Sequence, residues 1–164
     1  MKTDVVPLVA ALVGALLPLA TAQIAYCPAP YILIGGEACL YIPGGTYTWD
    51  GARDLCHTIT VASPYSSHLA EIESCNVLSS LWNYIKYKLE RPGNYWIGGS
   101  DSGSEGTWYW ERTTQPDVPK GAPFWFTEEP DGDDLENHLV VATNGFFADG
   151  QGDQLYGVIC QAII

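Results

Sequence analysis

A run of acidic side chains late in the chain is the feature that most directly suggests chemistry. Six carboxylates fall in one short, turn-rich stretch before an apolar segment: Glu128, Glu129, Asp131, Asp133, Asp134 and Glu136. Like charges this dense repel one another, by roughly 1 kcal/mol per pair at about 4 Å in water and by more near a protein surface. The run is therefore either a solvated loop or a cage for a hard cation such as Ca²⁺, which takes roughly six to eight oxygen ligands.

The composition limits the partners of such a site. The 164-residue chain has a net charge of −12 at pH 7, which argues against nucleic acids and anionic membranes as partners and is compatible with cation binding. Paired carboxylates such as Asp101 and Glu105 could in principle hydrolyse glycosides. However, His57, His68 and His138 lie far apart in the sequence, and the Gly-x-Ser-x-Gly nucleophile motif does not occur, so we do not expect an enzyme.

Residues 1–22 have the features of a secretory signal peptide. A basic start at Lys2 is followed by a short apolar core and by small residues that end at Ala22. A membrane anchor is the alternative, which the shortness of the apolar run disfavours. We expect cleavage after Ala22, which leaves one secreted domain, 23–164, and we expect no membrane-spanning segment in it.

The cysteines are consistent with the predicted secretion. All five lie in the expected mature chain, at Cys27, Cys39, Cys56, Cys75 and Cys160. Secretion favours disulfides, and the odd number leaves one cysteine free or paired between chains. A zinc site is disfavoured because no Cys-x-x-Cys or His-x-x-x-His spacing occurs.

The elements that must position the acidic run change in type along the chain. Thr48 can cap a helix whose apolar positions extend to Ile59, and a second helix is predicted from Ser74 to Leu89. Short apolar segments follow, which indicates an α+β fold. The expected strands are 39–42, 68–72, 95–98, 107–110, 139–142, 145–148 and 156–160.

The segment from Gly98 to Asn137 has little predicted regular structure. Loops of this length are usually functional or disordered. Five large aromatic residues favour an ordered, packed loop: Trp108, Trp110, Phe124, Trp125 and Phe126.

A series of short motifs occurs in order along the chain: Cys27-Pro28 with Cys39-Leu40-Tyr41, the helix Thr48 to Cys56, Leu69-Ala70-Glu71-Ile72, Trp96-Ile97-Gly98-Gly99, Glu105 to Trp110, Glu129-Pro130-Asp131, Glu136-Asn137 and Val158-Ile159-Cys160. The order and spacing of the motifs are more specific than any one of them. Taken together, these motifs resemble the C-type lectin-like domain across nearly all of Cys27–Cys160.

The resemblance implies two disulfides, Cys27–Cys39 and Cys56–Cys160. The positions of a further inner disulfide of the family fall here on His138 and Gly152, so that disulfide is absent. Cys75 is left over, either as a free thiol or as the link in a covalent homodimer that would raise avidity.

The resemblance also implies a calcium site that binds sugar, with Glu129, Asp131, Glu136 and Asp149 as its ligands. The family's Asn before that late Asp falls on Ala148. A second, auxiliary Ca²⁺ would use Asp101, Glu105, Asp133, Glu136 and Asn137. The triplet Gln115-Pro116-Asp117 spells a galactose-type motif but lies too far from Glu136-Asn137, so we interpret it as a surface turn.

The differences from the family pattern at Asp131 and Ala148 make sugar binding less favourable than calcium binding. Ionised Glu129 and Asp131 only accept hydrogen bonds, and Ala148 removes an amide donor, although Asn137 or Asn144 could supply one. The resemblance still favours a secreted, calcium-dependent lectin that recognises microbial glycans in innate immunity, with mannose or galactose preference left open. The alternative is a domain of the same fold that binds a protein or mineral ligand without sugar recognition.

Overall fold

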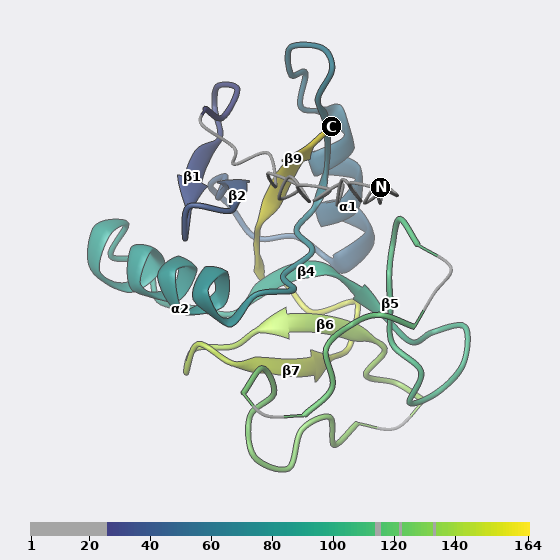
Figure 1. Cartoon of the computed structure of the whole chain (residues 1–164). Helices are drawn as coiled ribbons and strands as arrows, with labels where there is room; N and C mark the ends of the chain where they lie inside the picture. The colour runs from purple at the N-terminus through teal and green to yellow at the C-terminus, as the bar shows by residue number, and fades with distance from the viewer. Residues whose placement is uncertain (1–25, 114–115, 122, 133) are drawn as a thin grey trace, which may run out of the picture.

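The chain folds into two helices and a set of short strands, and the strands form two small sheets (Figure 1). The computed structural model describes residues 26–113, 116–121, 123–132 and 134–164. The expected signal peptide and Asp133 therefore lie outside the described residues. The elements are β1 Ile32–Ile34, β2 Ala38–Tyr41, α1 Trp49–Thr58, β3 Ser66–Leu69, α2 Cys75–Asn83, a π-helical turn Tyr84–Lys88, β4 Tyr95–Ser100, β5 Tyr109–Trp110, β6 His138–Val141, β7 Phe147–Gly150, β8 Gly157–Val158 and β9 Cys160–Ile163.

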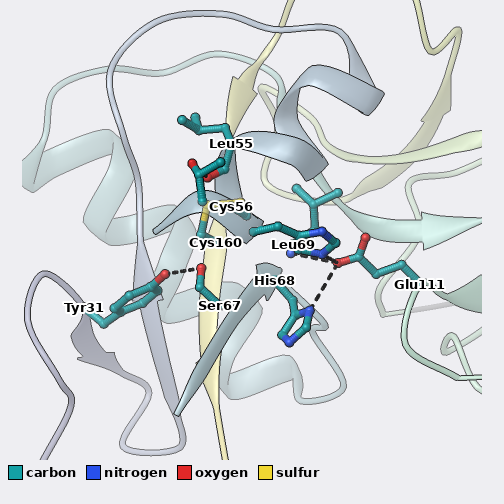
Figure 2. The surroundings of a disulfide bond; sticks show 10 residues. Tyr31, Leu55, Cys56, Ser67, His68, Leu69, Glu111 and Cys160 are labelled. Atoms are coloured by element: carbon teal, nitrogen blue, oxygen red, sulfur yellow. Dashed lines mark hydrogen bonds and ion pairs between the residues drawn. A yellow bond between two sulfur atoms is a disulfide. The ribbon is translucent and has the colours of Figure 1, made fainter. Parts of the chain in front are cut away.

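The first sheet joins the two ends of the described chain, in the strand order β1-β2-β9-β3. Disulfides link Cys27 to Cys39 and Cys56 to Cys160, the same pairs that the resemblance implies. Figure 2 shows the second disulfide beneath α1, beside Leu69 of β3. It connects the first helix to the last strand across a sequence separation of 104 residues.

The first helix follows the predicted pattern. The Thr48 side chain caps α1 by accepting a hydrogen bond from the Gly51 N–H at 3.2 Å, which satisfies one of the free amides at the helix start. Trp49, Ala52 and Cys56 are buried on the face that packs against β3 and β4. The capping residue and the apolar spacing together explain why α1 forms here.

The second helix also begins where the sequence predicts, because Ser74 precedes its first residue, Cys75. Val77, Leu78 and Leu81 are its buried stripe. The helix continues through the π-helical turn, in which Leu89 N–H donates to the Tyr84 carbonyl, a change of winding that periodicity alone does not predict.

The second sheet has the order β5-β4-β6-β7, with β8 running parallel to β4. β4 is the central strand of this sheet, and its first five residues are buried. Gly99 is required there, because a Cβ would lie 2.6 Å from the Leu139 side chain on β6. Gly98 N–H donates to the Ala70 carbonyl at 2.9 Å, which ties this sheet to the segment after β3.

The long loop is packed on an aromatic cluster, as its composition predicts. Trp108, Trp110, Phe124 and Trp125 are buried. The Trp108 and Trp125 rings contact edge to face at 5.2 Å, an arrangement that aromatic quadrupoles favour. Phe126 is the exception, because it is 46% exposed.

Several strand predictions differ from the structure. The expected strand 107–110 is shortened to β5, and the expected strand 145–148 is displaced to β7. The expected strand 68–72 is β3, which ends at Leu69, and the expected strand 156–160 divides into β8 and β9. β1 was not predicted from the residues. Within the described part of the chain, no helix has the length and apolarity needed to cross a bilayer.

Candidate functional site

Three carboxylates from two separate segments meet at one end of the second sheet. Glu129 and Asp131 come from the long loop, on either side of Pro130, and Asp149 comes from β7, where it is paired with Leu139. One oxygen from each carboxylate lies within 4.8 Å of the other two. The peptide bond between Glu129 and Pro130 is cis.

Backbone amides of the loop hold the Asp149 carboxylate in place. The Asp131 N–H donates to Asp149 Oδ1 at 3.3 Å, and the Gly132 N–H donates to Asp149 Oδ2 at 2.9 Å. Both Asp149 oxygens therefore accept a loop amide, and the loop is fastened to β7 at this point.

A fourth carboxylate, that of Glu136, lies close to the cluster at Gly132. A Cβ at this position would lie 2.6 Å from Asp149 Oδ2, 2.9 Å from Glu136 Oε2 and 2.4 Å from Glu136 Cβ. The carboxylates of Asp149 and Glu136 thus converge on the space that only a glycine leaves open. The sequence signals Gly132 only as a turn residue in an acidic stretch.

The cluster is electrostatically unfavourable without a cation. Burial, with the Asp149 carboxyl and the charge of Asp131 adding to it, raises the pKa of Glu129 from 4.5 to about 7. Among the described residues, Glu129 Oε2 is buried without a hydrogen-bond partner. An oxygen-rich donor set with an unsatisfied buried carboxylate oxygen suits a hard cation such as Ca²⁺.

Asp101 directly follows β4 and is almost fully buried. Its Oδ2 accepts the Gly106 N–H at 2.8 Å, while its Oδ1 is buried without a hydrogen-bond partner among the described residues. Burial raises the pKa of Asp101, and the charge of Asp149 adds to the rise, so the two carboxylates are electrostatic neighbours.

The other residues expected at the auxiliary calcium site do not come together around Asp101 in the same way. Glu105 is exposed, and Asp133 lies outside the described residues. The Asn137 carbonyl accepts the Ser100 hydroxyl at 2.7 Å, and the Asn137 side-chain amide donates to the Asp134 carbonyl at 2.7 Å. Asn137 therefore already uses an amide hydrogen within the loop.

Two other parts of the sequence do not supply the amide that is missing at Ala148. Asn144 lies in the turn between β6 and β7, at the opposite end of the hairpin from Asp149, and its Oδ1 accepts the Phe146 N–H. The Asp117 carboxylate of the galactose-type triplet accepts a bond from the Thr113 hydroxyl and is not part of the carboxylate cluster. Gln115 of that triplet is outside the described residues.

An imidazole fills the place where the resemblance locates an inner disulfide. A Cβ at Gly152 would lie 2.5 Å from His138 Cδ2, and the His138 ring stacks on Trp49 with the ring centroids 4.3 Å apart. Burial lowers the pKa of His138; Asp50 opposes this shift and Arg53 adds to it. A neutral, packed imidazole therefore connects β6 to α1 beside the carboxylate cluster.

Comparisons with known proteins show which family the chain resembles. Residues 45–162 match the family described as "Lectin C-type domain". The human protein "C-type lectin domain family 17, member A" is 28% identical over 123 residues, which are 75% of this chain but only 29% of that protein. A protein of Oxyuranus scutellatus named "C-type lectin mannose-binding isoform" is 27% identical over 139 residues. These residues are 82% of this chain and 82% of that protein.

A solved structure has the same fold. The crystal structure of the C-type lectin CEL-I from Cucumaria echinata matches with a TM-score of 0.69 at 21% identity, over 84% of this chain and 97% of that one.

Proposed function

The chain belongs to the C-type lectin domain family, and from that premise we propose that it is a secreted, calcium-dependent lectin that binds carbohydrate. The observation that carries the proposal is the convergence of Glu129, Asp131 and Asp149, with Glu136 beside them at Gly132. We further propose that the glycans it recognises are microbial and that it acts in innate immunity.

The cluster has the donors that a calcium site needs. Glu129, Asp131, Glu136 and Asp149 would hold Ca²⁺ through their carboxylate oxygens, and a high charge count favours affinity. The Asp149 carboxylate is already oriented by two loop amides. When bound, the ion would offer open coordination positions to two neighbouring hydroxyls of a sugar.

A second ion would involve Asp101, whose buried Oδ1 lacks a partner among the described residues. Glu105, Asp133, Glu136 and Asn137 complete the set that the resemblance implies. Because Asp101 and Asp149 interact electrostatically, filling either site would lower the repulsion at the other.

The donor set is less favourable for the sugar than for the ion. Sugar hydroxyls both donate and accept hydrogen bonds, and ionised carboxylates can only accept. With Ala148 in place of an amide, and with one amide hydrogen of Asn137 already donated to the Asp134 carbonyl, fewer donors remain for the hydroxyl lone pairs. The Glu129-Pro130-Asp131 triplet combines features of mannose-type and galactose-type sequences and leaves the preference between these sugars open.

Calcium binding is tested by thermal unfolding of the full mature domain. We expect Ca²⁺ to raise the Tm relative to chelator, because a ligand of the folded state stabilises it through linkage. Asp149→Asn should shrink this shift, whereas Asp117→Asn, outside the cluster, should leave it unchanged. An identical melt of the wild type in Ca²⁺ and in chelator would contradict the calcium proposal.

Sugar binding is tested on a glycan array in Ca²⁺ with wild type, Ala148→Asn and Ala148→Asp. We expect Asn to strengthen binding because it restores both an oxygen ligand and an amide donor. The Asp variant is the matched control, since it adds the oxygen without the donor and should not strengthen binding. Blank arrays for all three proteins would contradict the sugar proposal.

Blank arrays would favour a second function, calcium-dependent binding of a protein or mineral surface. The absence of an amide donor at Ala148 supports this candidate. So do three exposed apolar side chains near the loop and its hairpin: Phe126, Leu135 and Phe146. A domain of this kind would retain the Tm shift with Ca²⁺ while binding no glycan.

A further inference from the structure

Two histidines and a glutamate from three elements meet on a face that the carboxylate cluster does not use. His57 lies in the last turn of α1, His68 lies on β3, and Glu111 directly follows β5. One ligand atom of each lies within 4.8 Å of the other two. Figure 2 shows the His68 ring and the Glu111 carboxylate directed at each other, with Leu69 beside them.

The two distances from the imidazoles to the glutamate are close to those around a tetrahedral metal ion. His57 Nε2 is 3.3 Å from Glu111 Oε1, and His68 Nδ1 is 4.0 Å from the same oxygen. With metal bonds of about 2.0–2.2 Å to imidazole and carboxylate, neighbouring ligand atoms lie about 3.4 Å apart. The first pair already has this spacing, and the second needs only a small side-chain movement.

One oxygen of the glutamate lacks a partner without a metal. The Glu111 side chain is 8% exposed, and its Oε1 accepts the Leu69 N–H at 3.1 Å and lies at hydrogen-bond distance, 3.3 Å, from His57 Nε2. Its Oε2 is buried without a hydrogen-bond partner among the described residues. A separation of 4.0 Å is too long for a hydrogen bond from His68, so that imidazole nitrogen faces the carboxylate without bonding to it.

A neighbouring hydroxyl orients His68 as a ligand. His68 Nε2 lies 2.9 Å from the Ser66 hydroxyl, which leaves Nδ1 to face Glu111. Metal-binding histidines usually bond their second nitrogen in this way. Burial, followed by the charges of Arg112 and His57, lowers the pKa of His68 and favours the neutral form that binds metals.

The site is open to solvent and its nearby cations have partners of their own. His57 and His68 line a surface groove of about 330 Å³ together with Thr60 and Tyr65, which provides an entry path. Arg53 pairs with Asp50 at 3.0 Å, and Arg112 pairs with Glu71 at 3.2 Å. These pairs reduce the repulsion that the two guanidinium groups would exert on a metal ion.

We propose that His57, His68 and Glu111 bind a divalent transition metal, with Zn²⁺ as the expected ion and water in the fourth position. Two imidazoles and one carboxylate suit zinc, whereas Ca²⁺ prefers oxygen ligands only. The site is independent of the calcium and sugar proposals, because it shares no residue with the carboxylate cluster. A bound ion would fasten α1, β3 and the start of the long loop to one another.

Isothermal titration with ZnCl₂ tests the proposal. All proteins carry Cys75→Ser, which removes the free thiol, and contain saturating Ca²⁺, which occupies the carboxylate cluster. We expect the Cys75→Ser protein to bind one Zn²⁺ and His57→Gln/His68→Gln in the same background to lose binding. His138→Gln is the matched histidine control and should retain it, while Ser66→Ala should weaken binding by roughly tenfold or more.

A second readout covers variants that fold poorly. Co²⁺ added to the Cys75→Ser protein should give the visible absorption of a four-coordinate ion, and Zn²⁺ should displace it. His57 is exposed, so His57→Gln alone is expected to fold and to lose this spectrum. Absence of Zn²⁺ binding by the Cys75→Ser protein, or unchanged binding in the His57→Gln/His68→Gln variant, would overturn the proposal.

Discussion

At the scale of single residues, the balance of amides and carboxylates decides what the cluster binds. Replacing an amide with a carboxylate adds charge for a cation and removes a donor for a hydroxyl. Asp131 and Ala148 both act in the direction that favours the ion over the sugar. The function of this domain therefore depends on whether other groups of the ligand compensate for the missing donors.

The raised pKa of Glu129 predicts an unusual pH dependence in the absence of metal. The folded protein holds this proton up to about pH 7, while the unfolded chain releases it near 4.5, so metal-free stability should fall as the pH rises through this window. Glu129→Gln removes the effect. In chelator, we expect the Tm advantage of the variant over the wild type to be larger at pH 8 than at pH 5.

Calcium provides the control for that measurement. Ca²⁺ at pH 8 should raise the Tm of the wild type more than that of Glu129→Gln, because the ion replaces the proton among the carboxylates. A Tm difference between the two proteins that is the same at both pH values in chelator would contradict the assigned pKa.

Individual residues differ in how far the sequence could place them. Glu129, Asp131 and Asp149 were located through motifs of fixed spacing, and the fold brings them together. His57 and His68 lie apart in the sequence and match no metal-binding spacing. Only the pairing of β3 and the packing of α1 bring these imidazoles to within 5.1 Å, measured between ring centroids, and such long-range contacts leave no local pattern.

At the scale of elements, local signals predict the helices better than the strands. α1 has a capping residue and an apolar stripe within its own sequence, so its bounds follow from nearby residues. The strands are short, and their limits depend on partners that are distant in the chain. β3 ends at Leu69 because its pairing with β9 ends at Cys160, which a single segment cannot reveal.

The β6–β7 hairpin is where the absent inner disulfide should matter most. His138 begins β6, and Gly152 follows β7, so the two positions bracket the strand that carries Asp149. A Cβ at Gly152 would lie against the His138 ring, 2.5 Å from Cδ2 and 3.7 Å from Cγ, so the two positions face each other across this place. Packing of an imidazole replaces a covalent link at this place.

His138→Cys/Gly152→Cys should therefore restore the link and stabilise the domain. Closing a loop of about 15 residues contributes about 3 kcal/mol in the chain-entropy model, less any loss of the stacking on Trp49. Chemical unfolding of the oxidised double variant should give a larger free energy of unfolding than either single variant. No gain over the single variants would show that His138 already provides equivalent stability.

At the scale of the whole molecule, Cys75 is the feature that bears on assembly. Cys75 is the free cysteine of the described residues and is exposed at the start of α2, whereas the four paired cysteines are buried. Beside it is a groove of about 300 Å³ with apolar lining from Leu78, Trp82 and Phe146. A second copy that covers this groove would bring two thiols together.

We predict a covalent homodimer through Cys75. Non-reducing electrophoresis of protein secreted under oxidising conditions should show a band of twice the monomer mass that disappears on reduction. The Cys75→Ser variant should show the monomer band alone. A single monomer band for the wild type would contradict the dimer and identify Cys75 as a free thiol.

The strand order has a practical consequence for how the domain is handled. β1 and β9 belong to the same sheet, and Figure 1 shows this sheet at the opposite end of the molecule from the loop that carries the carboxylates. A tag or tether attached after the last strand therefore leaves the acidic surface facing away from a sensor chip or bead. The position of the last strand therefore sets the orientation of the domain on a support, and the loop needs no engineering.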